Sequence, residues 1–208
     1  MKSIIRTTLM FLVVGVVAIS CESSKPKQTI ENLKSAITGE SNASAMYMAF
    51  SVKAAEDGYP NISKMFAAAT TAEAIHVNNH NAVLVTLGEE VYTAEIEIPE
   101  MAEIAENLQT AIDGETYEFT VMYPAFLADA ETEKCNEAIT SFTWALQAEA
   151  SHARLYTIAL QILEMTGSDE TVAPVWYTCP QCGDLYDTIE ELDFCSICAM
   201  STDSFLIF

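Results

Sequence analysis

The motif Glu-x-x-His occurs twice at matching places in the two halves of the chain, as Glu73 with His76 and Glu149 with His152. Residues three apart on an α-helix share a face, so each motif presents a carboxylate and an imidazole together. A single motif of this kind usually marks a surface pair. Here the two copies use two of the three histidines of the chain, and mainly apolar and small residues surround them. This pattern favours two buried metal-ligand pairs.

A second repeat supplies further carboxylates. Residues 32–41 (NLKSAITGES) and 107–116 (NLQTAIDGET) share six of ten letters, and they align Glu40 with Glu115. The simplest explanation is a duplicated helical hairpin. One Glu from each of two helices, with Glu-x-x-His from each of two others, is the ligand set of a di-iron or di-manganese carboxylate bundle. Two divalent cations would also neutralise four buried carboxylates, which are costly without partners.

Each repeat places a glycine directly before its glutamate, at Gly39 and Gly114. A glycine inside a helix costs roughly 1 kcal/mol relative to alanine, so its presence in both copies needs a reason. We expect these glycines to allow close helix approach beside the metals, which leaves room for the glutamates to reach inward.

Four more residues lie near the expected ligands. Glu118 follows the second repeated glutamate by three residues, where the first half has Ala43, so one metal is offered an extra carboxylate unless Glu118 is a surface residue. Tyr47 and Tyr123 follow the repeated glutamates by seven and eight residues, and they either hydrogen-bond a ligand or form ordinary core. His80 is expected to be a plain polar residue near a helix end, with an outer-sphere partner of the metals as the alternative.

The spacing of apolar residues predicts four long helices. A turn (57–61, DGYPN) separates the first two, and an extended crossover (89–99) separates the second from the third. This order predicts an all-α four-helix ferritin-like bundle with a long crossover between helices 2 and 3. The bundle is expected to span residues 29–166, with helices at about 29–57, 62–87, 100–129 and 134–166.

After a linker at 167–174, residues 175–208 form a short tail with four cysteines spaced C-x2-C-x12-C-x2-C. Paired C-x-x-C motifs place four thiolates tetrahedrally around iron or zinc, and a metal would organise a tail too small to fold on its own core. Two disulfides are the alternative in an exported chain. The expected metal ligands are Cys179, Cys182, Cys195 and Cys198.

The first 21 residues have the pattern of a signal peptide, with Lys2 and Arg6 before a short apolar run. A small residue followed by Cys21 resembles a bacterial lipoprotein cleavage site, so Cys21 is the expected lipidated residue and 22–28 a tether. An uncleaved N-terminal anchor is the alternative. Either reading predicts an exported protein on the periplasmic side of a bacterial envelope, in contact with the membrane only through this anchor.

The net charge of −21, with only nine lysines and arginines, leaves no basic patch to neutralise phosphates. Nucleic acid is therefore excluded as an expected partner.

Residues 29–200 resemble rubrerythrin, a ferritin-like di-iron domain fused to a rubredoxin-like domain. The resemblance is carried by GES around Glu40, GETYE with Glu115 and Glu118, both Glu-x-x-His motifs, and CPQCG around Cys182. All seven di-iron ligand positions hold ligand-type residues, and Tyr47 and Tyr123 match tyrosines near the family's di-iron site. The resemblance implies two non-haem iron ions in the bundle and a rubredoxin-like tail. The family usually forms head-to-tail dimers, which bring one chain's rubredoxin centre near another's di-iron site.

The resemblance also implies an activity in oxidative stress defence. The family reduces hydrogen peroxide to water, with electrons relayed through the iron held by the four cysteines. The electron donor stays unknown. Iron handling by ferroxidase chemistry is the alternative, and a zinc-stapled, inert bundle is a third. One departure is CSICA at 195–199, where the family usually has CPxCG; it places the iron affinity and redox potential of the tail in question.

Overall fold

The structure is a computed structural model that describes residues 25–97 and 101–208. The expected signal peptide, the lipidation site at Cys21 and the first part of the tether lie outside these residues. Among the helices that the structure describes, none is both long enough and apolar enough to span a bilayer.

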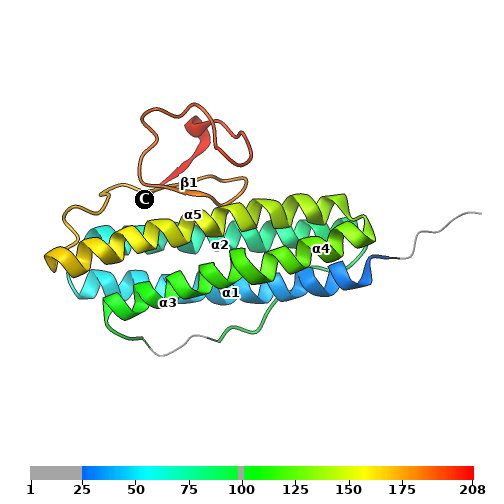
Figure 1. The fold of residues 1–208 in the computed structure, drawn as a ribbon, viewed down its shortest axis with the longest axis horizontal. Coiled ribbons are helices and arrows are strands. Elements are labelled where there is room, and N and C mark those ends of the chain that lie inside the picture. The colour runs from blue at the N-terminus through cyan, green and yellow to red at the C-terminus, as the bar shows by residue number, and fades with distance from the viewer. Residues whose placement is uncertain (1–24, 98–100) are drawn as a thin grey trace, which may run out of the picture.

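Four long helical rods form the body of the molecule, and the third rod is interrupted by a π-helical turn (Figure 1). α1 packs mainly against α2, and α3 packs against α5, so each half of the repeat forms a helical hairpin; contacts of α2 with α5 and of α1 with α4 join the two halves. The predicted four-helix bundle with its crossover is therefore confirmed. The elements are α1 (Lys27–Glu56), α2 (Pro60–Thr86), α3 (Ile104–Tyr117), the π-helical turn η1 (Glu118–Met122), α4 (Tyr123–Glu133) and α5 (Asn136–Thr166).

Local chemistry explains the helix ends. Pro60 is the first residue of α2, where the absence of an N–H costs nothing. The carboxylate of Asp169 accepts hydrogen bonds from the backbone N–H groups of Asn61 and Ile62, at 2.6 and 3.1 Å, so the linker caps α2. α5 ends at Gly167, whose φ of 69° is favourable for a residue without a side chain.

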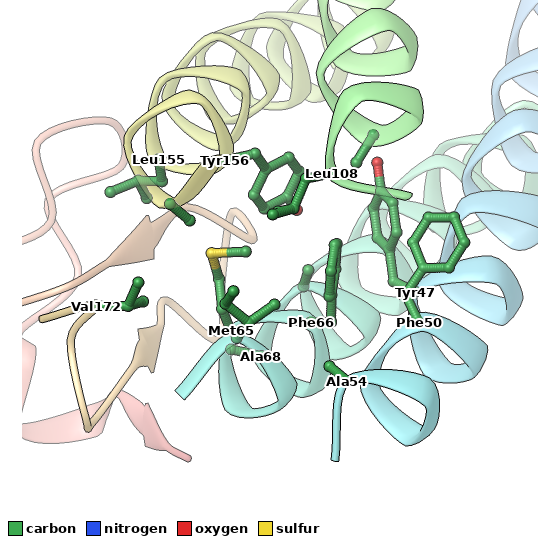
Figure 2. Packing of buried hydrophobic residues seen from close by; sticks show 14 of the residues in the cluster. Tyr47, Phe50, Ala54, Met65, Phe66, Ala68, Leu108, Leu155, Tyr156 and Val172 are labelled. Carbon is green, nitrogen blue, oxygen red and sulfur yellow. The ribbon is translucent and has the colours of Figure 1, made fainter. Parts of the chain in front are cut away.

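The bundle interior has one aromatic-rich apolar cluster toward each end. In the first, Tyr47, Phe50, Phe66 and Tyr156 pack together, with ring centroids 5.3 Å apart for Phe50 and Phe66 and 5.7 Å apart for Phe66 and Tyr156 (Figure 2). The second cluster contains Tyr123, Phe126 and Phe142. These clusters hold the helices in register and exclude water from the polar side chains between them.

The tail lies across α2 and α5 (Figure 1). Its antiparallel sheet has the order β2-β1-β3. Three apolar residues of the linker and tail, Val172, Trp176 and Leu185, are buried in the first cluster of the bundle, so the two parts share a core. The tail elements are β1 (Tyr177–Thr178), β2 (Leu185–Tyr186), the 3-10 turn η2 (Thr202–Ser204) and β3 (Leu206–Ile207).

Candidate metal centres

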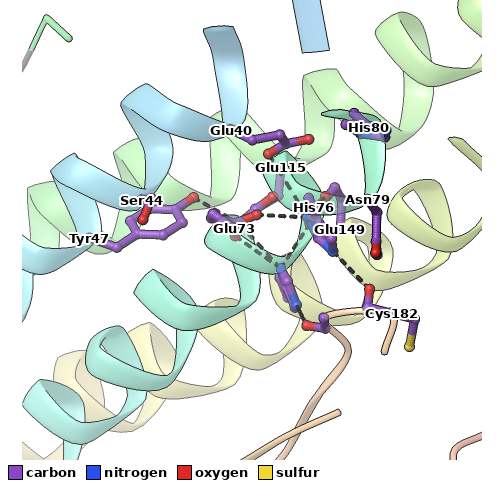
Figure 3. Close-up of polar contacts among 12 residues, drawn as sticks. Glu40, Ser44, Tyr47, Glu73, His76, Asn79, His80, Glu115, Glu149 and Cys182 are labelled. Carbon is purple, nitrogen blue, oxygen red and sulfur yellow. Dashed lines mark hydrogen bonds and ion pairs between the residues drawn. The ribbon is translucent and has the colours of Figure 1, made fainter. Parts of the chain in front are cut away.

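Each of the four rods contributes a buried glutamate to one point in the bundle, and α2 and α5 each add a histidine (Figure 3). All six side chains are at most 1% exposed. Their ligand atoms form two groups, and within each group the atoms lie within 4.8 Å of one another. One group is Glu40, Glu73, His76 and Glu149, and the other is Glu73, Glu115, Glu149 and His152.

Two glutamates are shared between the groups. The Nδ1 atom of His76 lies 2.9 Å from Glu73 Oε2 and 2.9 Å from Glu149 Oε1. The Nδ1 atom of His152 lies 2.8 Å from Glu149 Oε2 and 3.4 Å from Glu73 Oε1. Each shared carboxylate therefore faces both histidines, as a bridging ligand would. Glu115 lies on the His152 side only, at 3.6 Å.

Crowding of buried carboxylates shifts their protonation. Burial, followed by repulsion from Glu149 and Glu73, raises the pKa of Glu115 to about 8 and the pKa of Glu40 well above its usual range. Burial also opposes ionisation of Glu73, but its interactions with His152 and His76 outweigh burial and lower its pKa to about 2. Without metal ions, protons bound to Glu40 and Glu115 reduce the repulsion among the buried carboxylates. The fully ionised cluster would need positive charge, such as that of metal ions, to be stable.

The donor atoms fit metal ions. Several buried oxygens of the shared and terminal glutamates, together with Nδ1 of His152, make no hydrogen bond. Nε2 of His76 lies 2.9 Å from the carbonyl oxygen of Cys182, and Nε2 of His152 lies 3.1 Å from that of Gly183. A carbonyl only accepts, so each Nε2 carries a proton and each Nδ1 faces the carboxylates, where a metal ion would take the place of the proton on Nδ1. Four carboxylates and two such imidazole nitrogens suit two transition-metal ions.

The four tail cysteines form a second centre. Cys179 Sγ lies 3.5 Å from Cys198 Sγ, and Cys182 Sγ lies 3.5 Å from Cys195 Sγ. These separations are too long for disulfides, whose sulfurs are about 2.05 Å apart, and all four tail cysteines are free of disulfides. They approach the edge of a tetrahedron with metal–sulfur bonds of about 2.3 Å, which is about 3.8 Å. The set therefore fits one four-coordinate metal.

The two cysteine loops share a backbone hydrogen bond and a left-handed residue, although their sequences differ. The N–H of Gly183 donates to the carbonyl of Cys179 at 3.0 Å, and the N–H of Ala199 donates to that of Cys195 at 3.0 Å. Gly183 has a φ of 81°, and Ala199 has a φ of 60°. The departure from CPxCG therefore leaves the loop geometry intact and places an alanine in a left-handed conformation that favours glycine.

Glu118 begins the π-helical turn and is half-buried. It belongs to neither group of ligand atoms, although burial and then the neighbouring Glu40 and Glu115 carboxylates raise its pKa well above the usual range. The π-helical turn widens the third rod at this residue, as π-bulges often do at functional sites. Glu118 is placed beside the cluster as an additional carboxylate, with Ala43 at the equivalent place in the first half.

Both predicted tyrosines contact terminal glutamates. The hydroxyl of Tyr47 donates to Glu115 Oε1 at 2.7 Å, and the hydroxyl of Tyr123 donates to Glu40 Oε1. Each tyrosine is also part of an aromatic cluster. The hydrogen-bonding and core interpretations of the sequence thus both apply.

The expectation of a plain polar role for His80 is wrong. Its side chain is 0% exposed, with Nε2 at 3.0 Å from the Tyr123 hydroxyl and Nδ1 at 2.8 Å from Ser141 Oγ. His80 follows His76 by four residues on the same face of α2, and this spacing was the signal for a buried position.

The packing role expected for the two repeat glycines is wrong at Gly114, where an added Cβ would meet nothing within 4 Å. At Gly39 an added Cβ would lie 3.5 Å from Glu118 Oε1, an ordinary contact. Instead, both glycines line a groove of about 260 Å³ that reaches Tyr47 and Glu118. Missing side chains here leave the groove open as far as Tyr47 and Glu118, which lie beside the cluster.

The fold and the two centres together define a ferritin-like di-metal carboxylate protein with an attached four-cysteine metal domain. The family model described as Rubrerythrin matches residues 31–160, and the chain belongs to the rubrerythrin family. Members of this family are generally oxidoreductases with a di-iron site. The buried glutamates and histidines form that site in this chain, and the four cysteines form a rubredoxin-type metal site.

Individual relatives agree with this assignment. The chain is 35% identical over 190 residues to rubrerythrin-2 of Clostridium acetobutylicum, covering 89% of this chain and 100% of the relative. It is 34% identical over 177 residues to nigerythrin of Nitratidesulfovibrio vulgaris, covering 85% of each. A structure of fully reduced, all-ferrous nigerythrin superposes with a TM-score of 0.77 over 86% of each chain, at 35% identity. A bacterioferritin of Desulfovibrio desulfuricans, at 18% identity and a TM-score of 0.66 over 70% of this chain and 85% of that one, shares the fold.

Proposed function

We propose that the protein is a non-haem di-iron peroxidase that reduces hydrogen peroxide to water. Each peroxide takes up two electrons and two protons and yields two water molecules. In the bundle, two iron ions would supply one electron each to the bound peroxide. The shared glutamates Glu73 and Glu149 would bridge the ions, and Glu40 with His76 and Glu115 with His152 would complete the two halves.

The contact between the two centres carries this proposal. Carbonyl groups of Cys182 and Gly183 accept hydrogen bonds from the two di-iron histidines, at 2.9 and 3.1 Å. A one-electron centre is thereby held against a two-electron site. A ferroxidase that stores iron needs no such attached relay, so the contact favours reductive turnover fed by an external electron donor.

The groove lined by Gly39 and Gly114 supports entry of a small substrate. It opens beside Glu118, whose raised pKa favours a carboxyl group that holds a proton near the cluster. Hydrogen peroxide is small and polar enough for this path. Glu118 would give or take a proton there, or offer an extra oxygen to one iron.

The cellular setting is also part of the proposal. We infer a homodimer that is exported and tethered by a lipid on Cys21 on the periplasmic side of a bacterial envelope. This would place peroxide defence in the envelope. Labelling with a radioactive or alkyne-tagged fatty acid tests the tether, with Cys21→Ala as the control. Label on the parent that is lost in Cys21→Ala supports lipidation of Cys21, and equal labelling of the two proteins contradicts it.

One experiment tests the activity. The purified protein is assayed for iron and zinc, reduced, and mixed under anaerobic conditions with either peroxide or oxygen. Rapid reoxidation of both centres by peroxide is the expected result. Indifference to peroxide, with reoxidation by oxygen and ferric iron build-up, would favour ferroxidase chemistry. A chain that holds zinc and no iron would contradict both.

A further inference from the structure

A buried line of hydrogen bonds links one di-iron glutamate to the edge of the bundle. Ser141 Oγ lies 2.8 Å from His80 Nδ1, and His80 Nε2 lies 3.0 Å from the Tyr123 hydroxyl. The Tyr123 hydroxyl in turn donates to Glu40 Oε1. His80, Tyr123 and Glu40 are fully buried, and Ser141, at 6% exposed, is the least buried of the four. The line therefore runs from a glutamate of the metal site to the member of the line that lies nearest the surface.

The chemistry of the four groups fixes the direction of the line. When metal ions replace the proton on Glu40, its carboxylate only accepts, so the single proton of Tyr123 is given to it. The Tyr123 oxygen then accepts from His80, which requires a proton on Nε2 and a lone pair on Nδ1. That lone pair accepts from the Ser141 hydroxyl. Burial, together with the positive charge of protonated His76, lowers the pKa of His80 to about 3, in keeping with a neutral ring.

The other half of the bundle lacks this line among the described residues. The repeat places Tyr156 at the position equivalent to His80, 76 residues later. The Tyr156 hydroxyl makes no hydrogen bond, and its ring packs against Tyr47 with centroids 5.7 Å apart. Tyr47 donates to Glu115 and is otherwise surrounded by aromatic rings. The pairs Tyr47–Glu115 and Tyr123–Glu40 occupy equivalent places in the two halves. They differ in that a histidine, His80, is hydrogen-bonded to the hydroxyl of Tyr123 only.

We propose that His80 is a positioning residue that orients Tyr123 and relays protons from Ser141 to the Glu40 side of the di-iron site. This inference rests on the proposed function, because peroxide reduction consumes two protons for each peroxide. In one relay event Ser141 passes its proton to Nδ1 and takes one from water. Nε2 passes its proton to Tyr123, and Tyr123 passes its own to Glu40. One proton enters from water at Ser141, and Glu40 gives one to an oxygen of peroxide, so the two protons consumed per peroxide need two such events. Rotation of the hydroxyls and the ring restores the line.

Two substitutions separate relay from packing. His80→Leu removes both ring nitrogens and should lower peroxide turnover at least tenfold while iron content stays at the parent level. In His80→Gln the side-chain amide sits where Nε2 was, so it still donates to Tyr123 but does not relay a proton. Its iron content should be normal and its turnover as low as that of His80→Leu. The matched control is Tyr156→Phe, which removes a hydroxyl without a hydrogen bond at the equivalent position and should keep the parent rate.

The direction of the line is measured separately from activity. Nitrogen-15 NMR of the zinc-loaded protein reports the tautomer of His80, whose signals are identified by their loss in His80→Gln. A proton on Nε2 is expected whether or not the protein reduces peroxide, so failure of the proposed function is distinguished from failure of this inference. A proton on Nδ1 would overturn the inference. So would a parent-like rate in either His80 variant, or loss of iron from both.

Discussion

His76 and Cys182 join the two metal centres across a single hydrogen bond, with Nε2 of His76 donating to the carbonyl of Cys182 at 2.9 Å. Figure 3 shows the sulfur of Cys182 turned away from this contact. His152 makes the parallel bond to Gly183 at 3.1 Å. The family resemblance implies that such contacts form between two chains of a dimer. In this structure they form within one chain, so one chain contains a complete connection.

This connection predicts the outcome of mixing two inactive chains. One carries Cys182→Ser and Cys195→Ser, which removes the tail metal, and the other carries Glu73→Gln and Glu149→Gln, which removes the bridging carboxylates. Because each tail serves its own bundle, co-expressed dimers should show less than a tenth of the parent peroxide turnover. Steady-state peroxide consumption of the purified mixed dimer is the measurement. Recovery of a substantial share of the parent rate would show that tails serve the neighbouring chain.

The same contact makes Gly183 intolerant of a side chain. An added Cβ would lie 2.3 Å from Nε2 of His76 and 3.0 Å from the carbonyl of Ala72, and the φ of 81° is itself unfavourable for alanine. Gly183→Ala should therefore push the cysteine loop away from the bundle. We expect a fall in melting temperature, and slower electron transfer between the centres by stopped-flow absorbance, with four-cysteine metal content retained.

Ala199 provides the matched control in the other loop. Its φ of 60° costs roughly 1–2 kcal/mol for a residue with a side chain, and glycine would remove this strain. Glycine also raises the conformational entropy of the unfolded chain, which offsets part of the gain. Ala199→Gly should raise the free energy of unfolding by about 1 kcal/mol, as measured by chemical denaturation of the zinc-loaded protein. A decrease would show that the loop conformation at Ala199 is not strained.

Glu118 should affect turnover more than metal binding. It lies in neither group of ligand atoms but faces the groove and the cluster. Glu118→Ala should retain both irons near the parent level and slow peroxide turnover at least tenfold, because one iron loses its neighbouring carboxyl group. Iron analysis and stopped-flow reoxidation by peroxide are the measurements. If the variant turns over like the parent, the asymmetry between Glu118 and Ala43 has no catalytic role.

Gly114 tests the groove as a path for substrate. An added side chain at Gly114 has free space, so Gly114→Leu should fold and hold metal normally. It should also partly fill the groove of about 260 Å³ and raise the KM for peroxide severalfold. The control is Gly114→Ala, whose single methyl should leave KM nearly unchanged. A large loss of iron in the leucine variant would favour a packing role for this glycine instead.

Much of this architecture was predictable because it repeats in the chain. The two Glu-x-x-His motifs and the repeated glutamates fix which helix faces meet, and the cysteine spacing fixes the tail. The role of Gly114 was mispredicted, because whether a missing side chain serves packing or leaves a groove depends on how far apart the helices lie. That separation is a tertiary property, set here by the aromatic clusters and the π-helical turn at Glu118.

The role of His80 was missed for a related reason. A polar residue at a core-facing position is stable only if it finds partners, and these partners come from α4 and α5, which are distant in sequence. The docking of Cys182 and Gly183 on the bundle within one chain was likewise hidden. Nothing in the C-x-x-C spacing states which surface a loop covers.

The pKa values of the buried cluster predict an unusual pH dependence for the metal-free protein. The folded pKa of Glu115 is about 8, above its ordinary value of 4.5, so the folded protein binds this proton more tightly than the unfolded chain does. Its contribution to stability is complete below pH 4.5 and is lost as pH rises toward 8. Glu40 and Glu118, also raised, act in the same direction. Glu73, lowered to about 2, contributes above pH 4.5 and loses its contribution as pH falls toward 2.

The melting temperature of the chelator-treated protein should therefore be highest near pH 4.5 and fall steadily up to pH 8. When zinc binds, the zinc ions replace the protons on the carboxylates. Because protons and zinc compete for the same oxygens, zinc affinity should rise as the pH increases from 4.5 to 8. Circular dichroism melts of both forms at matched ionic strength are the measurement. Glu115→Gln, which cannot ionise, should flatten the fall of the metal-free protein between pH 4.5 and 8. A melting temperature that rises with pH in the metal-free parent would contradict the protonated cluster.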